Sequence, residues 1–199
     1  MVLDKDTADK KDLLALASAA IAGGVDIIQL RYKHGNIKDI LKIGKALREI
    51  TAKCNVLFIV NDDVTLANAL DADGVHLGRE DLSIQKGRAI IGEKKIIGYS
   101  THTFAQAKKA VLGGADYISI GPIWETPTKA HYKAVGLKIL KKLKEEVKIP
   151  IFAIGGINLS NIGEVIRNGA DGIAVVRAII DEKDPEASAR RLKKELAKR

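Results

Sequence analysis

Short apolar runs alternate along the chain with longer segments in which apolar residues recur every three or four positions. The runs at 56–60, 95–98 and 150–154 are almost continuously apolar, which is typical of parallel strands covered on both faces. The segments 13–21 and 40–47 place their apolar residues on one helical face. The same helical period continues at 105–111, 137–147 and 162–166. The pattern therefore predicts strands that alternate with helices.

A turn followed by a short strand recurs four times and divides the chain into similar units. Each turn contains glycine, asparagine or aspartate, and each includes an aspartate just before the strand: Asp26, Asp73, Asp116 and Asp171. These aspartates are 47, 43 and 55 residues apart, about two strand–helix units. The four strands after these turns, the three apolar runs described above and a short first strand at 1–4 make eight strands. We expect one domain over residues 1–199, a compact (β/α)8 barrel. An open doubly wound sheet is the alternative, but the repeat has no break where its strand order would reverse.

The composition is that of a folded chain without disulfides. Of 199 residues, 46% are hydrophobic and 29% are charged, which excludes a disordered chain. The single cysteine, Cys54, excludes a disulfide framework, and we expect it to be a buried, inert thiol. No apolar run approaches the roughly 20 residues of a spanning helix, and the first residues do not form a signal peptide. We expect a soluble, cytoplasmic protein.

The net charge of +8 comes from 33 Lys and Arg against 25 Asp and Glu. Only 4% of the residues are aromatic, so the stacking surface of single-strand nucleic-acid binders is missing. Anionic small molecules explain a positive field equally well. A non-catalytic basic module that binds nucleic acid is kept as an alternative of another class.

Three polar residues alternate along the end of the predicted second strand. Alternation along the strand sends Gln29, Arg31 and Lys33 to one side. Active sites of such barrels lie at the carboxyl ends of the strands. An amide and two cations at such a strand end could bind phosphate oxygens. The simpler alternative is that these side chains only extend into solvent at the end of the strand. We favour the phosphate site because three donors are aligned.

Carboxylates follow the third and fourth strands. The third strand ends in Asn61 and Asp62, with Asp63 next, and Asp81 follows the fourth. Hard oxygen ligands beside cationic donors are typical of Mg²⁺ sites that share the ion with phosphates. Capping of the next helix is the alternative role for each aspartate. We favour the metal-binding role over capping, because these aspartates follow strands that neighbour the one carrying Arg31 and Lys33.

The later loops add hydroxyl groups and glycines. Ser100 follows the fifth strand and either donates to a phosphate oxygen or caps the next helix. The long segment 121–131, with Thr126, Thr128 and Lys129, is suited to a mobile lid over an anion. The loops after strands 7 and 8, including Gly156, are the usual phosphate site of these barrels. His76 is interpreted as a hydrogen-bonded core residue, and no Ser-His-Asp or Cys-His arrangement is recognisable.

These motifs together resemble those of the thiamine phosphate synthase family. The resemblance covers about residues 23–180 and lies in five stretches: Gln29-Leu30-Arg31-Tyr32-Lys33, Asn61-Asp62, Gly74-Val75-His76-Leu77-Gly78-Arg79-Glu80-Asp81, Thr126-Pro127-Thr128-Lys129 and Ala153-Ile154-Gly155-Gly156-Ile157. The resemblance implies a transferase of thiamine biosynthesis. The enzyme would join hydroxymethylpyrimidine diphosphate to a thiazole phosphate and release pyrophosphate.

The resemblance also implies a role for each site residue. The diphosphate would be held by Gln29, Arg31, Lys33, Ser100 and Lys129, of which Arg31, Lys33, Ser100 and Lys129 would act on the leaving group. Mg²⁺ would be bound by Asp62 and Asp81, and Asn61 would lie against the pyrimidine. The thiazole phosphate would be taken by Thr126, Thr128, Gly156, Val176 and Arg177. The partners would be two phosphorylated small molecules, without nucleic acid or membrane, and the sequence allows a homo-oligomer.

The chain departs from the family pattern at three places. Arg177 stands where serine is typical, and Arg79 stands where glutamine is common. The N-terminus is unusually short, which makes the first strand the least secure of the expected elements. The nearest rival is the related thiazole tautomerase, a proton-transfer enzyme that needs neither metal nor a diphosphate clamp. Another phosphate-binding barrel isomerase would need an acid/base pair that the sequence does not reveal.

Overall fold

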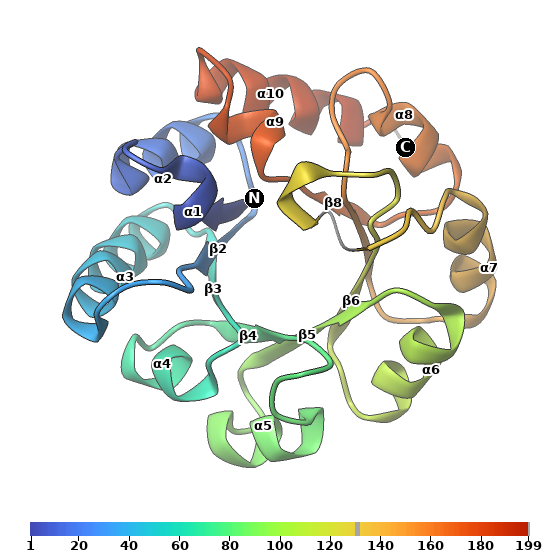
Figure 1. Cartoon of the computed structure of the whole chain (residues 1–199), viewed down its shortest axis with the longest axis horizontal. Coiled ribbons are helices and arrows are strands. Elements are labelled where there is room, and N and C mark those ends of the chain that lie inside the picture. The colour runs from blue at the N-terminus through green and yellow to red at the C-terminus, as the bar shows by residue number, and fades with distance from the viewer. Residues whose placement is uncertain (130–131, 199) are drawn as a thin grey trace.

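The strands of the computed structural model form one parallel sheet that curls into a barrel (Figure 1). The structure describes residues 1–129 and 132–198. Within them the strand order follows the chain from first to last. The strands are β1 (Val2–Asp4), β2 (Ile27–Arg31), β3 (Leu57–Asn61), β4 (Gly74–Leu77), β5 (Ile96–Thr101), β6 (Tyr117–Ile120), β7 (Ile151–Ile154) and β8 (Gly172–Ala174). The fold class predicted from the sequence, a (β/α)8 barrel, is confirmed.

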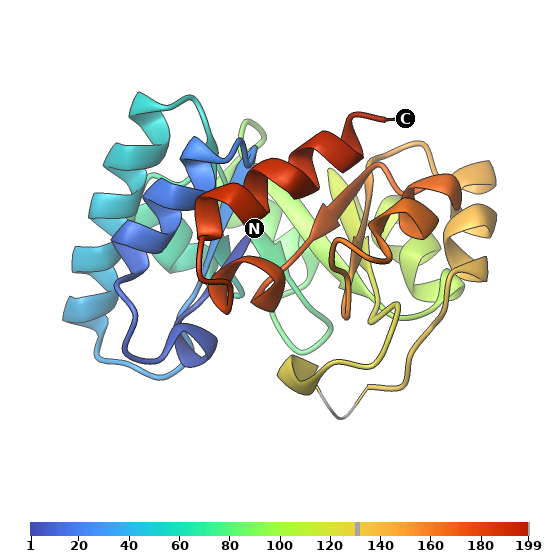
Figure 2. The ribbon, with the colours of Figure 1, turned by 90° about the horizontal axis from the view of Figure 1, so that it is seen from above.

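Helices surround the barrel (Figure 1). They are α1 (Lys5–Ala8), α2 (Leu13–Ala22), α3 (Ile37–Lys53), α4 (Val64–Ala69), α5 (Ile84–Ile91), α6 (Phe104–Leu112), α7 (Lys138–Glu146), α8 (Ile162–Arg167), α9 (Arg177–Ile180) and α10 (Pro185–Leu196), with a 3₁₀ turn, η1 (Pro127–Lys129). In Figure 2, η1, α1 and α9 lie on one side of the barrel, the side of the strands' carboxyl ends. No helix among the described residues is long and apolar enough to span a membrane.

The recurring aspartates tie the opposite, amino-terminal ends of the strands together. Asp73 accepts a hydrogen bond from the Phe58 backbone N–H of the preceding strand at 2.7 Å and pairs with Arg48 at 2.9 Å. Asp116 and Asp171 repeat this arrangement with Ile97 of β5 and Ile151 of β7. The repeat found in the sequence is therefore structural. Through Asp73, Asp116 and Asp171 it joins β3 to β4, β5 to β6 and β7 to β8 at the end remote from the site.

The barrel interior is filled partly by rings that lie across glycines. Tyr117 lies on β6, and its ring covers Gly98 of β5, where a Cβ would come within 2.1 Å of the phenol carbon. The ring of Phe152 covers Gly172 of β8 in the same way, at 2.5 Å. The absent side chains at these two glycines leave room for large rings from the neighbouring strands. These rings line the bottom of a cavity described below.

Two sequence-based expectations need correction. Cys54 follows the last residue of α3 and is exposed, not buried. Its helix ends at the protein surface, so the thiol faces solvent rather than the core. The fifth strand extends to Thr101, three residues beyond the predicted run at 95–98. Ser100 therefore lies within a strand, because β5 pairs with β6 through Ser119 and Ile120.

Candidate active site

A cavity of about 270 Å³ opens at the carboxyl ends of the strands. It brings together residues that are far apart in the sequence. The predicted site residues that line it are Gln29, Arg31, Asn61, Ser100, Thr126, Thr128, Gly156, Val176 and Arg177. Lys33, Asp62 and Asp81 form a cluster at the neighbouring ends of β2, β3 and β4. The side chain of Lys129 lies outside the described part of the structure.

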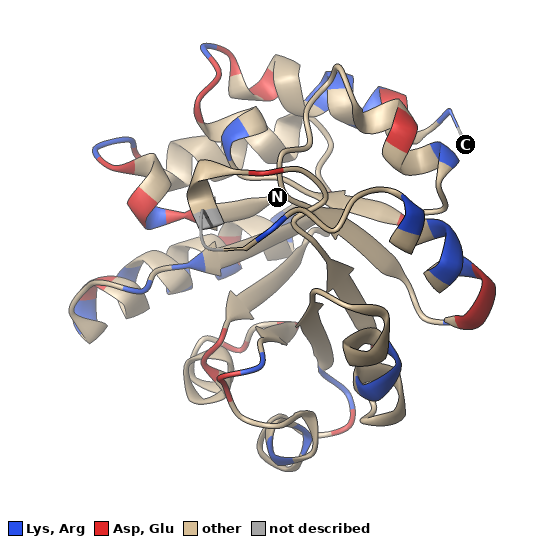
Figure 3. Cartoon of the chain, turned by 45° about the vertical axis from the view of Figure 1, so that its right-hand side comes forward, with Lys and Arg blue, Asp and Glu red and all other residues tan. Residues whose placement is uncertain are grey.

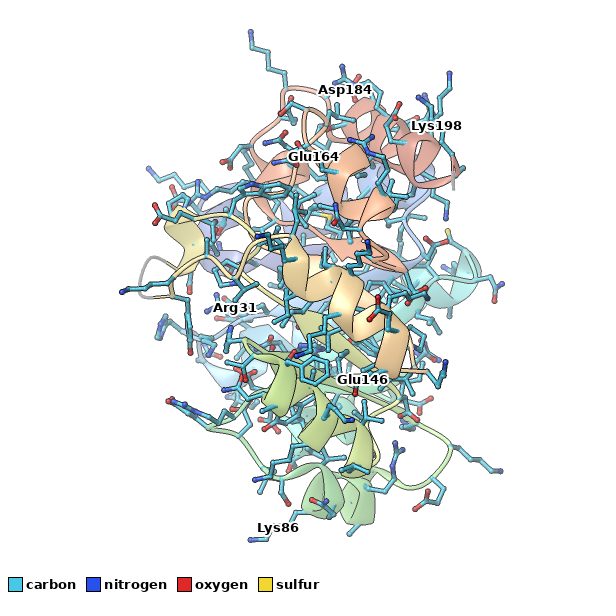
Figure 4. The ribbon with its side chains drawn as sticks, turned by 90° about the vertical axis from the view of Figure 1, so that its right-hand side faces the viewer. Arg31, Lys86, Glu146, Glu164, Asp184 and Lys198 are labelled. Atoms are coloured by element: carbon cyan, nitrogen blue, oxygen red, sulfur yellow. The ribbon has the colours of Figure 1, made fainter. Side chains whose placement is uncertain are left out.

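Arg31 is held by carboxylates from the first strand and the first helix. Its guanidinium lies 2.8 Å from Asp4 Oδ1 and 3.7 Å from Asp6 Oδ2. Asp4 is 1% exposed, and it also accepts from the Thr7 hydroxyl and the Asp6 backbone N–H. These contacts fix the guanidinium on the side of the molecule that carries η1 (Figure 4). Asp4 is not among the predicted site residues, although a carboxylate at the end of a predicted strand is a usable signal.

The two predicted metal ligands face one another. Asp62 has a left-handed backbone with φ of 67°, and its carboxylate lies 2.9 Å from Lys33 Nζ. Burial raises the pKa of the Asp81 carboxyl, and the neighbouring Asp62 charge raises it further. The Gly78 backbone N–H donates to Asp81 Oδ2 at 2.7 Å, and this hydrogen bond lowers the pKa of the carboxyl. Carboxylate oxygens are the donors that divalent cations take. Asp62 and Asp81 supply two such carboxylates, and the described residues contain no group of three or more His, Cys, Asp or Glu side chains that could hold a metal.

Other residues take the helix-capping roles that competed with the site interpretation. Asp63 caps α4, since its carboxylate accepts from the Leu66 backbone N–H. Ser83 caps α5 and Thr103 caps α6. Asp62, Asp81 and Ser100 are therefore not the N-caps of these helices. Their side chains instead contact Lys33, the Gly78 backbone N–H and His76, respectively.

The loop after β6 is packed against the two glycines after β7. Gly155 and Gly156 both have left-handed backbones, with φ of 96° and 68°. A Cβ on Gly155 would come within 2.4 Å of Pro122, and one on Gly156 within 2.8 Å of the Trp124 Cβ. The glycine pair thus has a packing role that the phosphate interpretation did not include. It brings the segment with Thr126 close to the end of β7.

Arg177, the departure from the family pattern, lies beside this loop. Its Nε donates to the Thr128 hydroxyl over 3.4 Å, and its Nη1 lies 3.0 Å from Asp181. Arg177 lines the cavity together with Thr126 and Gly156. A guanidinium at this position adds positive charge to the wall where the sequence predicted a phosphate. The side chain therefore lies beside the proposed phosphate site and links the loop to α9.

Below the mouth, the cavity has a polar floor. His76 is 6% exposed and occupies β4. Its Nδ1 lies 2.9 Å from the Tyr117 hydroxyl and its Nε2 lies 2.9 Å from Ser100 Oγ. Ser119 Oγ lies 3.3 Å from the same Nε2. The prediction of a hydrogen-bonded buried histidine is confirmed, but the sequence did not reveal that it contacts a site residue.

Most charged residues of the described chain lie outside the lining of the cavity. Figure 3 shows Lys and Arg spread over the outer helices, with a basic stretch on α7. Lys108 and Lys144 pair with Glu146 and Asp171, respectively. This distribution indicates that most of the Lys and Arg side chains that give the chain its positive charge belong to a solvated surface.

The chain is similar to known proteins over nearly its whole length. The family model described as thiamine monophosphate synthase matches residues 1–179. A thiamine-phosphate synthase of Gloeobacter violaceus is 46% identical over 179 residues, 90% of this chain and 52% of that protein. The chain thus spans about half the length of this relative. A thiamine-phosphate synthase of Chloroflexus aurantiacus is 44% identical over 180 residues, 90% of this chain and 83% of that protein.

A solved structure agrees with these sequence matches. The structure described as thiamine phosphate pyrophosphorylase from Pyrococcus furiosus superposes with a TM-score of 0.91 at 37% identity. The match covers 99% of this chain and 94% of that one. The resemblance inferred from the motifs is confirmed. The chain belongs to the thiamine monophosphate synthase family.

Proposed function

We propose that the protein is a Mg²⁺-dependent transferase that couples hydroxymethylpyrimidine diphosphate with thiazole phosphate. The products are thiamine phosphate and pyrophosphate. One observation carries the proposal: Arg31 lines the cavity while the Lys33–Asp62–Asp81 cluster lies at the adjoining strand ends. Cations and paired carboxylates at one rim are the groups that a departing diphosphate needs. Family membership supports the same activity.

The chain's own groups would act first on the leaving diphosphate. Arg31, fixed by Asp4, offers a rigid fork to its oxygens, and Lys33 offers a point charge. Ser100 Oγ faces the same cavity and would donate a further hydrogen bond. Mg²⁺, held by Asp62 and Asp81, would neutralise charge on the diphosphate. The bond between the pyrimidinylmethyl carbon and the diphosphate oxygen then breaks, and the electron-rich ring stabilises the cation.

The second substrate would lie against the opposite wall. Thr126, Thr128, Gly156 and Arg177 line the part of the cavity built from the ends of β6, β7 and β8. We expect them to hold the thiazole phosphate, so that the thiazole nitrogen faces the pyrimidine cation and forms the new carbon–nitrogen bond. That nitrogen carries no proton, so this step requires no protein base. Catalysis would rest on electrostatics and positioning.

The test is to incubate purified protein with both substrates and to measure pyrophosphate and thiamine phosphate with and without Mg²⁺. Arg31→Ala and Asp62→Asn should each lower kcat about 10²-fold or more, the usual cost of removing a charge-stabilising group. Lys86→Ala is the matched control, because Lys86 lies exposed on α5, away from the cavity (Figure 4).

Several outcomes would contradict the proposal. Equal rates with and without divalent cation would remove Mg²⁺ from the mechanism. Conversion of a thiazole phosphate isomer in the absence of the pyrimidine substrate, with no coupling, would identify a tautomerase instead. Full turnover by the Lys129→Ala variant would remove that lysine from the diphosphate site.

A further inference from the structure

The polar floor of the cavity contains a buried histidine and phenol that the proposed mechanism does not use. His76 and Tyr117 lie at one level of the barrel, since both residues pair with Gly98 of the strand between them. Ser100 and Ser119 pair with each other one layer nearer the mouth. The hydrogen-bonding groups therefore run upward from Tyr117, through His76, to Ser100.

Gly98 makes the contact between the two rings sterically possible. The Tyr117 ring lies over this glycine, and a Cβ there would come within 2.4 Å of the phenol oxygen. The oxygen thereby reaches across β5 to His76 Nδ1 at 2.9 Å. The Tyr117 and Phe152 rings also meet edge to face, with centroids 5.3 Å apart. The phenol is thus held in place by packing from two sides.

The tautomer of His76 depends on which group donates in its contact with the Tyr117 hydroxyl. Burial raises the pKa of Tyr117 well above its usual range, so the phenol keeps its hydrogen. Among the described residues, the hydrogen-bond partner of this hydroxyl is His76 Nδ1. If Nδ1 carried the proton, it would donate to the phenol oxygen, and the hydrogen of the buried phenol would have no acceptor among the described residues.

We propose that Tyr117 fixes His76 as the Nε2–H tautomer, and that this ring orients the Ser100 hydroxyl toward the diphosphate. Nε2–H then donates to Ser100 Oγ, so the hydrogen of Ser100 is directed away from the histidine and into the cavity. Ser119 Oγ, at the longer distance of 3.3 Å, shares the same donor. His76 and Tyr117 are positioning residues that act through Ser100. This inference rests on the proposed function for its catalytic consequence.

The tautomer is tested without substrates. Long-range ¹H–¹⁵N correlation spectra of protein labelled with ¹⁵N-histidine distinguish a protonated from an unprotonated ring nitrogen, and His76→Gln identifies the signal. We expect His76 in the wild type to show a protonated Nε2 and an unprotonated Nδ1. In Tyr117→Phe the ring should exchange between both tautomers. A wild-type ring protonated at Nδ1, or at both nitrogens, would overturn the proposal.

The catalytic consequence is tested by kinetics with both substrates and Mg²⁺. We expect Tyr117→Phe to lower kcat about tenfold and His76→Asn about 100-fold, the range typical of supporting residues. The KM for the pyrimidine substrate should change little. His76→Gln should recover part of the loss, because its longer side chain carries an amide N–H group toward Ser100. Tyr99→Phe, a change on the same strand as Ser100 but outside the cavity lining, serves as the control.

A double-mutant cycle separates positioning from a purely structural role. In a Ser100→Ala background, neither His76→Asn nor Tyr117→Phe should lower kcat further, because both act through the missing hydroxyl. Additive losses would overturn the proposal. Absence of product with wild-type protein would overturn the proposed function and with it the role of Ser100. The spectra would still decide the tautomer in that case.

Discussion

Asp4 and Asp81 are carboxylates at strand ends, but their surroundings give them opposite electrostatic conditions. Asp4 is buried against Arg31 and two further hydrogen-bond donors, so its charge is compensated. Asp81 is partly buried beside another carboxylate, so its charge is opposed. A residue that is destabilised in this way in the metal-free protein is suited to bind a cation. At Asp81, stability therefore conflicts with the proposed metal binding.

We predict that Asp81→Asn stabilises the protein in the absence of metal and lowers the proposed Mg²⁺-dependent activity. The folded protein raises the pKa of this carboxyl above its ordinary value of 3.8. The folded state therefore binds the proton more tightly than the unfolded chain, and stability is lost as pH rises through the folded pKa. The Tm advantage of the variant should be absent below pH 4 and should reach a few degrees at pH 7.

Thermal unfolding followed by circular dichroism, with a chelator present, measures this difference. Glu80→Gln provides the control, because Glu80 is a neighbouring carboxylate that is largely exposed. A variant less stable than the wild type at pH 7 would contradict the electrostatic explanation. The asparagine retains an oxygen that can accept from the Gly78 backbone N–H, so loss of that hydrogen bond is not expected.

The strand–helix units are joined at their amino-terminal ends by aspartates that look alike in the sequence but differ in their contacts. Asp116 accepts from the Ile97 backbone N–H at 2.7 Å and lies 2.6 Å from Arg88. Asp26 pairs with Lys193 at 2.5 Å and is 70% exposed. Within the described residues, the Asp26 carboxylate accepts no backbone N–H, although its backbone carbonyl accepts from the Leu57 N–H at 3.0 Å. Only the carboxylates of the three later repeats therefore bind strand to strand.

We predict that Asp116→Ala costs about 2 kcal/mol of unfolding free energy, because the Ile97 N–H loses its partner in a partly buried place. For a chain of this length, that loss lowers Tm by roughly 4–8 °C. Asp26→Ala, the matched substitution, should cost no more than about 1 kcal/mol, since it removes an exposed ion pair. Equal effects in urea unfolding would contradict this distinction.

The whole barrel closes between its first and last strands by a weaker contact than those between the other neighbours. Among the described residues, the Val2 N–H donates to the Val175 carbonyl at 2.9 Å, just beyond the end of β8. Each other neighbouring pair of strands is joined by a register of three or four residue pairs. The proposed thiazole phosphate wall therefore adjoins the weakest seam of the barrel.

We predict that hydrogen exchange is faster at this seam than in the middle of the sheet. Backbone amides of β8 should exchange at least about tenfold faster than those of β5, because local opening at the seam breaks fewer hydrogen bonds. Hydrogen–deuterium exchange followed by mass spectrometry measures both segments in one experiment. Equal protection of 172–174 and 96–101 would show that packing from α9 and α10 compensates for the open ladder.

Much of the fold was predictable because it depends on local patterns of residue types along the chain. The spacing of apolar residues and the position of turn residues predicted the alternation of strands and helices. The four turns with an aspartate recur at similar intervals, which predicted a barrel of repeated strand–helix units. The rule that barrel sites lie at the carboxyl ends of strands then selected Gln29, Arg31 and Asp62. The Mg²⁺ ligation and substrate roles of these residues stay predictions, for which the experiments above are designed.

The sequence by itself determined the strand–helix order, the family and which polar residues end the strands, because these follow from residue types at fixed spacing along the chain. Only the tertiary structure decided which of those residues meet. Asp4 reaches Arg31, and Tyr117 reaches His76 across Gly98, through contacts between different strands. Such contacts depend on barrel curvature, on strand register and on a missing side chain. None of these leaves a periodic signal in the sequence.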